Sequence, residues 1–327
     1  MPILRKERVL VAIKIKGKSP IQAQADKLFS HTRSGSYGTR ARYKASCNKF
    51  LDFVHDEFKM KNLRNLQDKH VVAFIKARQE AGLATKTIKN DLGAIRYLHD
   101  MIPNVKHELS SNEELKKQHG ITLEMKIKGD RSWTNEEYSK MYDWLNKQSK
   151  KDGIEQLTAR DVRDTFVLGR TMGLRVAEAV AMHRSQAEHA LRTGTYQVKG
   201  EAKNGRFRQV PLSPEAREML IERLKIVNRG DSVFVQQDEK THQAINRIEK
   251  HLGRHRDKFE TEEGKERRSH DNGYNKLTFH GLRYNYVQER INREMLQGWS
   301  FREAAKIVTK EVGHNRLEVI NVYLGKK

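Results

Sequence analysis

Apolar residues recur every three or four positions in the first third of the chain, separated by polar residues. This spacing places the apolar side chains on one face of a helix. Three helices are predicted, with faces formed by Tyr43, Cys47, Phe50, Leu51, Val54 and Phe58, by Val71, Val72 and Ile75, and by Ile88, Leu92, Ile95 and Ile102. Pro103 is expected to stop the third helix. Residues 20–105 are therefore predicted to form a small helical bundle.

A second series of helices is predicted beyond residue 132. Helix starts are marked by capping residues at Thr134 with Glu137, Ser213 with Pro214, and Ser300 with Glu303. A helix over about 158–172 is expected to end at Gly173, because a glycine in the left-handed conformation commonly closes a helix. Another helix is predicted to begin near residue 280.

One segment has the pattern of a β-hairpin. Short strands at 195–199 and 206–212 flank an Asn204-Gly205 turn, and this is the only good hairpin that the sequence predicts. Residues 254–276 carry dense mixed charge and are predicted to form an exposed insertion. The predicted fold class is mainly α-helical with a small β-hairpin or sheet.

Composition indicates the class of partner. The 327 residues, 36% of them hydrophobic, suffice for two domains with a core in each. Lys and Arg outnumber Asp and Glu by 64 to 42, and the resulting net charge of +22 favours nucleic acid as a partner. Apolar runs such as Val9 to Ile13 are too short to cross a membrane. Because Cys47 is the only cysteine, intrachain disulfides are excluded and a reducing cytoplasm is expected.

Two pairs of residues combine reactive side chains with helical spacing. Arg175 follows Gly173, and Glu178 lies three residues later on the same predicted face. Taken alone, this pair would be interpreted as a surface ion pair. His280 and Arg283 are also three residues apart, so an imidazole and a guanidinium share one side of a helix and can hold a phosphate. An HxxR pattern alone also occurs by chance in basic proteins.

The other two places are the hairpin tip and the C-terminal region. Lys203 at the tip can reach a bound backbone and donate a proton to an oxygen that leaves phosphorus. The neighbouring alternatives are Lys199, Arg206 and Arg208. A Gly313-His314 pair precedes Tyr323, and one short helix between them would bring both side chains to a common pocket. The alternative is a frayed helix whose tyrosine packs on the core.

In combination and in this order, the residues resemble the tyrosine recombinase (phage integrase) family. The resemblance rests on GLRxxE at Arg175, the hairpin ending in Val210-Pro211-Leu212, HxLR at His280, GH at His314, and the tyrosine that follows. It covers about residues 132–327, and the helical unit is similar to the family's core-binding domain. The implied organisation is a basic arm at 1–19, a core-binding domain at 20–105, a linker at 106–131 and a catalytic domain at 132–327, forming a C-shaped clamp on DNA.

The resemblance implies a chemistry that uses no cofactor and no metal. Tyr323 would attack the scissile phosphate and form a 3′-phosphotyrosyl bond, which conserves the energy for rejoining. Arg175 and Arg283 would stabilise the charge that grows on phosphorus, and His314 would bind a phosphate oxygen.

The resemblance also assigns the proton transfers. His280 would accept the proton of the tyrosine, and Lys203 would give one to the departing 5′ oxygen. Glu178 would orient Arg175 as a supporting residue. A different pair, His251 and His255, lies four residues apart on a predicted helix, but it has neither a cysteine nearby nor an obvious third ligand, so packing or DNA contact is favoured over zinc binding.

The implied function is site-specific cleavage and rejoining of double-stranded DNA, for the integration or excision of a mobile element. A homotetramer on synapsed DNA, a possible accessory DNA-bending or directionality factor, and a cytoplasmic, nucleoid-associated location for a bacterial or phage-encoded protein are expected. Only four residues follow Tyr323, whereas many relatives carry a C-terminal segment that docks onto the neighbouring protomer. Two alternatives are a type IB topoisomerase-like relaxing activity and a sequence-specific DNA-binding protein that does not cleave.

Overall fold

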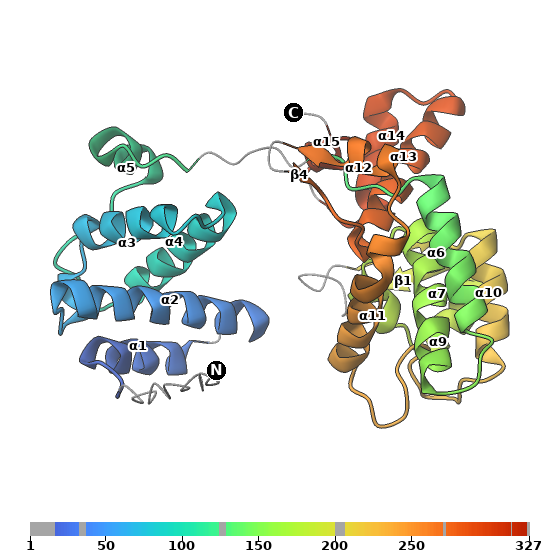
Figure 1. The fold of residues 1–327 in the computed structure, drawn as a ribbon, viewed down its shortest axis with the longest axis horizontal. Coiled ribbons are helices and arrows are strands. Elements are labelled where there is room, and N and C mark those ends of the chain that lie inside the picture. Colours follow the sequence, from blue (N-terminus) through green and yellow to red (C-terminus); the bar gives the residue numbers. More distant parts are fainter. Residues whose placement is uncertain are drawn as a thin grey trace, which may run out of the picture. The chain divides into compact units, whose positions relative to one another are not determined.

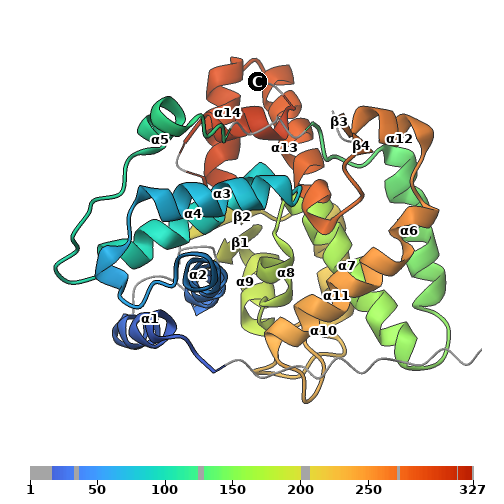
Figure 2. The same ribbon diagram turned by 60° about the vertical axis from the view of Figure 1, so that its left-hand side comes forward.

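The computed structural model describes residues 17–32, 37–123, 129–199, 207–270, 273–314 and 316–325. The chain divides into two compact units, Met1–Lys126 and Ile127–Lys327. Within the described ranges both units consist mainly of helices, and the second also holds short strands (Figures 1 and 2). The predicted fold class is confirmed. None of the described helices has the length and apolar character needed to cross a membrane.

The first unit is helical throughout its described elements. These are α1 (Pro20–His31), α2 (Tyr37–Phe58), the 3-10 helix η1 (Leu63–Asn65), α3 (Asp68–Glu80), α4 (Thr85–Asp100) and α5 (Asn112–His119). Helix α2 packs against α1, α3 and α4. The three predicted apolar faces supply most of the core, although Phe58 at the end of α2 is exposed.

Two helices of this unit were not predicted. Helix α1 begins at a capping box between Ser19 and Gln22 and buries only Ile21 and Ala25, too few positions for a periodic pattern. Helix α5 lies within the segment predicted as a linker. Its one buried residue, Leu115, joins the core of the first unit, so the surrounding charge hid the signal.

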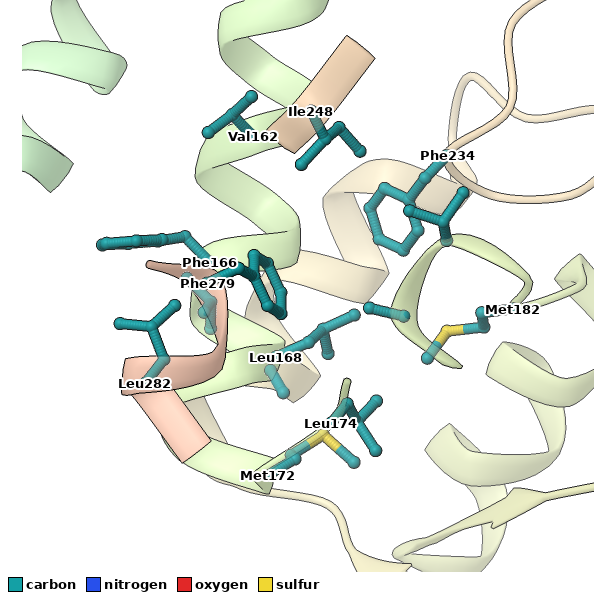
Figure 3. Packing of buried hydrophobic residues seen from close by; sticks show 14 of the residues in the cluster. Val162, Phe166, Leu168, Met172, Leu174, Met182, Phe234, Ile248, Phe279 and Leu282 are labelled. Atoms are coloured by element: carbon teal, nitrogen blue, oxygen red, sulfur yellow. The ribbon is translucent and has the colours of Figure 1, made fainter. Parts of the chain in front are cut away.

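The second unit carries fifteen described elements. These are α6 (Asn135–Gln148), α7 (Ile154–Met172), α8 (Val176–Val180), α9 (Arg184–Thr193), β1 (Thr195–Val198), β2 (Arg208–Pro211), α10 (Pro214–Leu224), α11 (Thr241–His255), the 3-10 helix η3 (Arg256–Lys258), α12 (Glu262–Arg267), β3 (Ser269–His270), β4 (Gly273–Tyr274), α13 (Phe279–Leu296), α14 (Phe301–Glu311) and α15 (Val319–Tyr323). Helix α7 packs against α6, α10, α11 and α13. Figure 3 shows Phe166 of α7 beside Phe279 and Leu282 of α13, in the core that joins these two helices.

The local start and stop signals were predicted correctly. The capping boxes at α6 and α14 form, and Ser213 caps α10. Helix α7 ends at Gly173, which has φ of +63°. Strands β1 and β2 pair antiparallel, with Val198 opposite Arg208. The Asn204-Gly205 turn between them lies outside the described residues.

The segment 254–276 is largely exposed or half-buried, as predicted, but it is anchored to the second unit by a few buried residues that were not predicted. This stretch contains the end of α11, η3, α12 and a second short hairpin, β3 with β4, whose two-residue strands are too short to give a sequence pattern. Arg268 is fully buried and forms two hydrogen bonds to Glu137, at 2.6 and 2.8 Å. Burial opposes ionisation of Glu137, but bonds from Arg268 and from two backbone amides lower the pKa of its carboxyl. The high density of charged residues suggested full exposure, but one of these residues, Arg268, is buried and pairs with Glu137.

This buried pair yields a prediction about stability. Glu137→Ala leaves the Arg268 guanidinium buried without a counter-charge, which should cost about 3–5 kcal/mol of unfolding free energy in the second unit. The measurement is urea unfolding followed by tryptophan fluorescence, because all three tryptophans, Trp133, Trp144 and Trp299, belong to that unit.

Glu136→Ala is the matched control. Glu136 is the preceding residue, is half exposed, and pairs with the exposed Lys140. Its replacement should change the unfolding free energy by no more than about 0.5 kcal/mol. Equal losses in the two variants would contradict a structural role for the buried pair.

Candidate active site

Tyr323 ends the short helix α15 and lies buried in a core cluster with Ile320 and Tyr284. Its ring meets the ring of Tyr284 edge to face, with 4.8 Å between centroids. The hydroxyl oxygen of Tyr323 lies 3.0 Å from Nε2 of His314 and accepts a hydrogen bond of 3.2 Å from Nε of Arg283. The structure thus brings His314 and Tyr323 together, by way of the short helix that the sequence predicts.

Arg283 connects three segments that are distant in sequence. It is completely buried in the second turn of α13. Besides Tyr323, its guanidinium donates to the carbonyl oxygen of Gly173 at 2.5 Å and to that of Val312. Burial lowers the pKa of Arg283, yet a guanidinium keeps its proton in proteins. A fixed positive charge therefore lies beside the tyrosine hydroxyl.

The turn between α7 and α8 depends on Gly173. A Cβ at this residue would lie 2.4 Å from the Tyr286 ring, and its positive φ suits glycine. The turn places Arg175 at the N-cap of α8 and leaves the Gly173 carbonyl oxygen facing Arg283. In the GLR sequence, Gly173 thus shapes the turn and Arg175 supplies a positive charge.

Glu178 holds the positive charges of the site together. Its carboxylate is buried and accepts from Nη1 of Arg175 at 2.6 Å and, through both oxygens, from Arg208 at 2.6 and 3.0 Å. Nη1 of Arg283 lies 3.9 Å away. Burial alone would raise the pKa of Glu178, but Arg208 and Arg175 outweigh this effect and lower it to about 2. The predicted pairing of Arg175 with Glu178 is therefore part of a buried network.

Arg208 has a different position from the one considered in the sequence. As a neighbour of Lys203 it was an alternative proton donor, but it is buried, and its Nε also donates to the carbonyl oxygen of Glu311 at 2.8 Å. These bonds make it the counter-charge of Glu178. The alternation of side chains along β2 could have indicated this burial, because Arg208 lies on the same inward face of the strand as Val210.

His280 occupies the first turn of α13 with its ring 6.2 Å from that of Tyr323 and 5.6 Å from that of Tyr284, between centroids. His280 is exposed at the surface of the DNA-free site, but the protein atoms packed around its ring reduce its hydration and lower its pKa to about 4, and the charges of Arg283, Arg131 and Arg175 act in the same direction. The imidazole is therefore neutral at neutral pH and able to accept a proton.

The lysine of the site is not located by the structure. Lys203 and the alternative Arg206 lie outside the described residues. Lys199 is described, follows β1 directly and is exposed. Its position at the base of the same hairpin keeps it as an alternative to Lys203.

The pair of histidines considered for zinc packs against an aromatic ring instead. The rings of His251 and His255 lie 4.9 Å apart, and Trp144 contacts both. No group of three or more potential metal ligands occurs in the described ranges of the chain.

Two residues near the site carry no motif and were missed in the sequence. Arg131 acts electrostatically on His280, and its backbone oxygen would lie 2.4 Å from a Cβ at Gly281. Gln288 donates a hydrogen bond of 2.8 Å to the backbone oxygen of Tyr323. No sequence signal identifies either, because their roles follow from contacts between distant segments.

Comparisons with known proteins give a consistent result. A model described as phage integrase family matches residues 131–327, and a model described as phage integrase, N-terminal, matches residues 22–106. The sequence has no significant match among curated proteins.

Similar solved structures include the Tn1549 transposon integrase in complex with transposon right end DNA, at TM-score 0.60 and 15% identity over 94% of this chain and 95% of that chain. XerH site-specific recombinase bound to its difH substrate matches at 0.57 and 20%, over 92% and 80% of the two chains. A fragment of lambda integrase, a dimer bound to a COC′ core site, matches at 0.61 and 15%, over 93% of each. At these identities the likeness shows the fold.

The phage integrase model spans more than half of the chain, and the matched region contains the whole cluster around Tyr323. The chain therefore belongs to the phage integrase family, the tyrosine recombinases, whose members break and rejoin DNA.

Proposed function

We propose that this protein is a site-specific recombinase that cleaves and rejoins double-stranded DNA through a 3′-phosphotyrosyl intermediate. One observation carries the proposal: the hydroxyl of Tyr323 lies within hydrogen-bond distance of both His314 and Arg283. A guanidinium and an imidazole are the groups that bind phosphate oxygens, and a phenol is a nucleophile that forms a stable phosphodiester. Their convergence suits attack by the phenol on a phosphate.

Charge stabilisation follows from the buried network. Arg175, Arg283 and His314 bind the nonbridging oxygens of the scissile phosphate and stabilise the charge that grows in the transition state. Glu178 orients Arg175 through the 2.6 Å contact. Because the guanidinium groups are held before DNA arrives, little reorganisation is needed during the reaction.

Two proton transfers complete the step. Tyr323 bonds to phosphorus and passes its proton to the neutral His280, while the bond from phosphorus to the 5′ oxygen breaks. That oxygen takes a proton from Lys203, or from Lys199 if the latter reaches it. Rejoining reverses each transfer, so no ATP is consumed.

The partner and the biological setting rest on the comparisons. The Tn1549 integrase, XerH and lambda integrase structures are complexes with DNA, and the names of the first and third link them to a transposon and a phage. By extension, the present chain is proposed to bind duplex DNA and to integrate or excise a mobile element. Assembly as a homotetramer on synapsed sites with an accessory factor, and a cytoplasmic, nucleoid-associated location, are further proposals that rest on the family resemblance alone.

The nucleophile is tested by Tyr323→Phe. The unchanged protein should form a covalent adduct on a nicked duplex from the DNA that flanks its gene, detected as a slower band on denaturing gels. The variant should form none, because phenylalanine has no oxygen to bond to phosphorus, and it should bind the same duplex with unchanged affinity.

Each alternative makes a different prediction in this assay. An adduct formed by Tyr323→Phe would refute the assigned nucleophile. No adduct from the unchanged protein, together with sequence-specific binding, would favour a protein that does not cleave. Relaxation of a supercoiled plasmid without any attachment site would favour the topoisomerase alternative.

The lysine is tested with a sulfur-containing leaving group. Lys203→Ala and Lys199→Ala should be compared on duplexes with an ordinary 5′ oxygen and with sulfur in its place at the scissile bond. A thiol has a pKa of only about 8.5, so it leaves without a proton donor. The variant that lacks the true donor should cleave the oxygen substrate poorly and the sulfur substrate at the unchanged rate. If sulfur rescues neither variant, neither lysine is the donor.

The protonation state of His280 gives a further prediction. Its Cε1 proton resonance, assigned by comparison with His280→Asn, should not titrate between pH 7.5 and 5.5 in the DNA-free protein, since its pKa is lowered to about 4. An unperturbed imidazole would titrate near about 6.5. A bound phosphate adds negative charge beside the ring and should move the midpoint upward. A midpoint near 6.5 without DNA would contradict the neutral imidazole.

A further inference from the structure

The carboxamide of Gln288 touches the nucleophilic residue at its backbone. Gln288 lies on α13, and its Nε2 donates to the carbonyl oxygen of Tyr323 at 2.8 Å and to Oδ1 of Asp130 at 3.1 Å. Its Oε1 accepts from Nη2 of Arg267 at 3.0 Å. The nitrogen faces two acceptors and the oxygen faces a donor, so the contacts determine the orientation of the amide.

Asp130 and Arg267 complete this contact. Nε of Arg267 donates to Oδ2 of Asp130 at 3.0 Å. Burial opposes ionisation of Asp130, but bonds from Ser132 and Arg267 lower the pKa of its carboxyl. Asp130 is therefore an ionised acceptor for Gln288. We call Asp130, Arg267 and Gln288 the clasp.

The clasp addresses a weakness of α15. A helix of five residues has about one turn, and such a helix is not stable by its own hydrogen bonds. Ile320 and Tyr323 are its only buried residues among those described. These two residues attach one face of α15 to the core through apolar contacts, which are not directional and do little to prevent the helix from shifting along the core surface. The bond from Gln288 fixes the backbone of Tyr323 to α13, the same helix that carries Arg283.

Helix α13 thus contacts Tyr323 at two places. Arg283 and Gln288 lie on one helix, and they hold the hydroxyl and the backbone of the same tyrosine. Both the hydroxyl and the backbone of Tyr323 are therefore held by α13. A displacement of about 1 Å of a nucleophile can reduce its reactivity about a hundredfold, so such a fixed reference matters for the rate.

We propose that Gln288 is a positioning residue for Tyr323, and that the clasp sets the alignment of the tyrosine with the scissile phosphate. This inference rests on the proposed function. Gln288 contacts Tyr323 at its backbone oxygen and not at its hydroxyl, so it acts through the backbone of the nucleophile. Its loss should therefore slow the attack on phosphorus without weakening the binding of DNA.

The test compares Gln288→Met and Gln288→Glu with the unchanged protein. Methionine keeps the length of the side chain but removes all three hydrogen bonds, while glutamate keeps the acceptor for Arg267 and loses both donors. The rate of covalent adduct formation is measured in single turnover, at saturating protein, on the nicked duplex that the unchanged protein cleaves. Both variants should cleave about tenfold or more slowly, with the dissociation constant for DNA changed less than twofold.

A matched control is available on the same helix. Asn292 is an exposed amide one turn after Gln288, and Asn292→Met should cleave at the unchanged rate. Sulfur at the leaving position should not rescue the Gln288 variants, because their defect lies in the attack and not in protonation of the leaving group. A purely structural defect would instead appear as a lower melting temperature together with weaker DNA binding.

A third variant does not depend on the half-buried Gln288. Arg267 is 40% exposed at its side chain, so Arg267→Gln should fold and should slow cleavage by a smaller factor in the same step. Cleavage at the unchanged rate by both Gln288 variants would overturn the clasp and leave the proposed function intact. Failure of the unchanged protein to form any adduct would overturn the proposed function, and this inference with it.

Discussion

The active site depends on a buried carboxylate that keeps positive charges close together. Arg175, Arg208 and Arg283 would repel one another in a region with little water, and burying any of them unpaired would be costly. Glu178 accepts from two of them and lies 3.9 Å from the third, so the cluster forms before any DNA phosphate enters. The free-energy cost of bringing these cations together is therefore met during folding, and the site carries positive charge before any ligand binds.

The helices around this carboxylate bring it close to Tyr323. Helix α7 ends in the glycine turn that presents Arg175, and α13 packs along α7 and carries His280, Arg283 and Gln288. Arg283 then spends two of its donors on the carbonyl oxygens of Gly173 and Val312. The arginine beside the Tyr323 hydroxyl thus also joins the end of α7 to the segment that leads to Tyr323, so the geometry around this hydroxyl depends on the packing of these elements.

The sequence was informative where the signals are local. Capping pairs such as Thr134 with Glu137 predicted helix starts, and the GH and HxLR motifs marked His314 and Arg283, which lie at the hydroxyl of Tyr323. It failed where a contact joins distant segments. Arg268 pairs with Glu137 across 131 positions, so its burial could not be read from the charged stretch that contains it.

Long-range contacts explain the remaining differences. Gln288 meets Tyr323 and Asp130 only through the fold, and nothing in its own neighbourhood marks it. Helix α5 contributes one buried residue, Leu115, and one apolar side chain in a polar stretch has no period. In each case the physical cause is packing between elements, which overrides local composition.

Arg267 and Arg268 are consecutive in the chain, but their side chains contact different parts of the second unit. Arg268 points into the core and pairs with Glu137 at the start of α6, while Arg267 contacts Asp130 and Gln288 near the C-terminal tyrosine. The two arginines therefore make contacts on opposite sides of the segment, and both contacts depend on the exact position of the pair in the chain. Deleting one amino acid just before the pair would place Ser269 where Arg268 meets Glu137, and inserting one would move Arg267 away from Asp130. Changes of length in this stretch should therefore be tolerated only where they leave these two side chains in place.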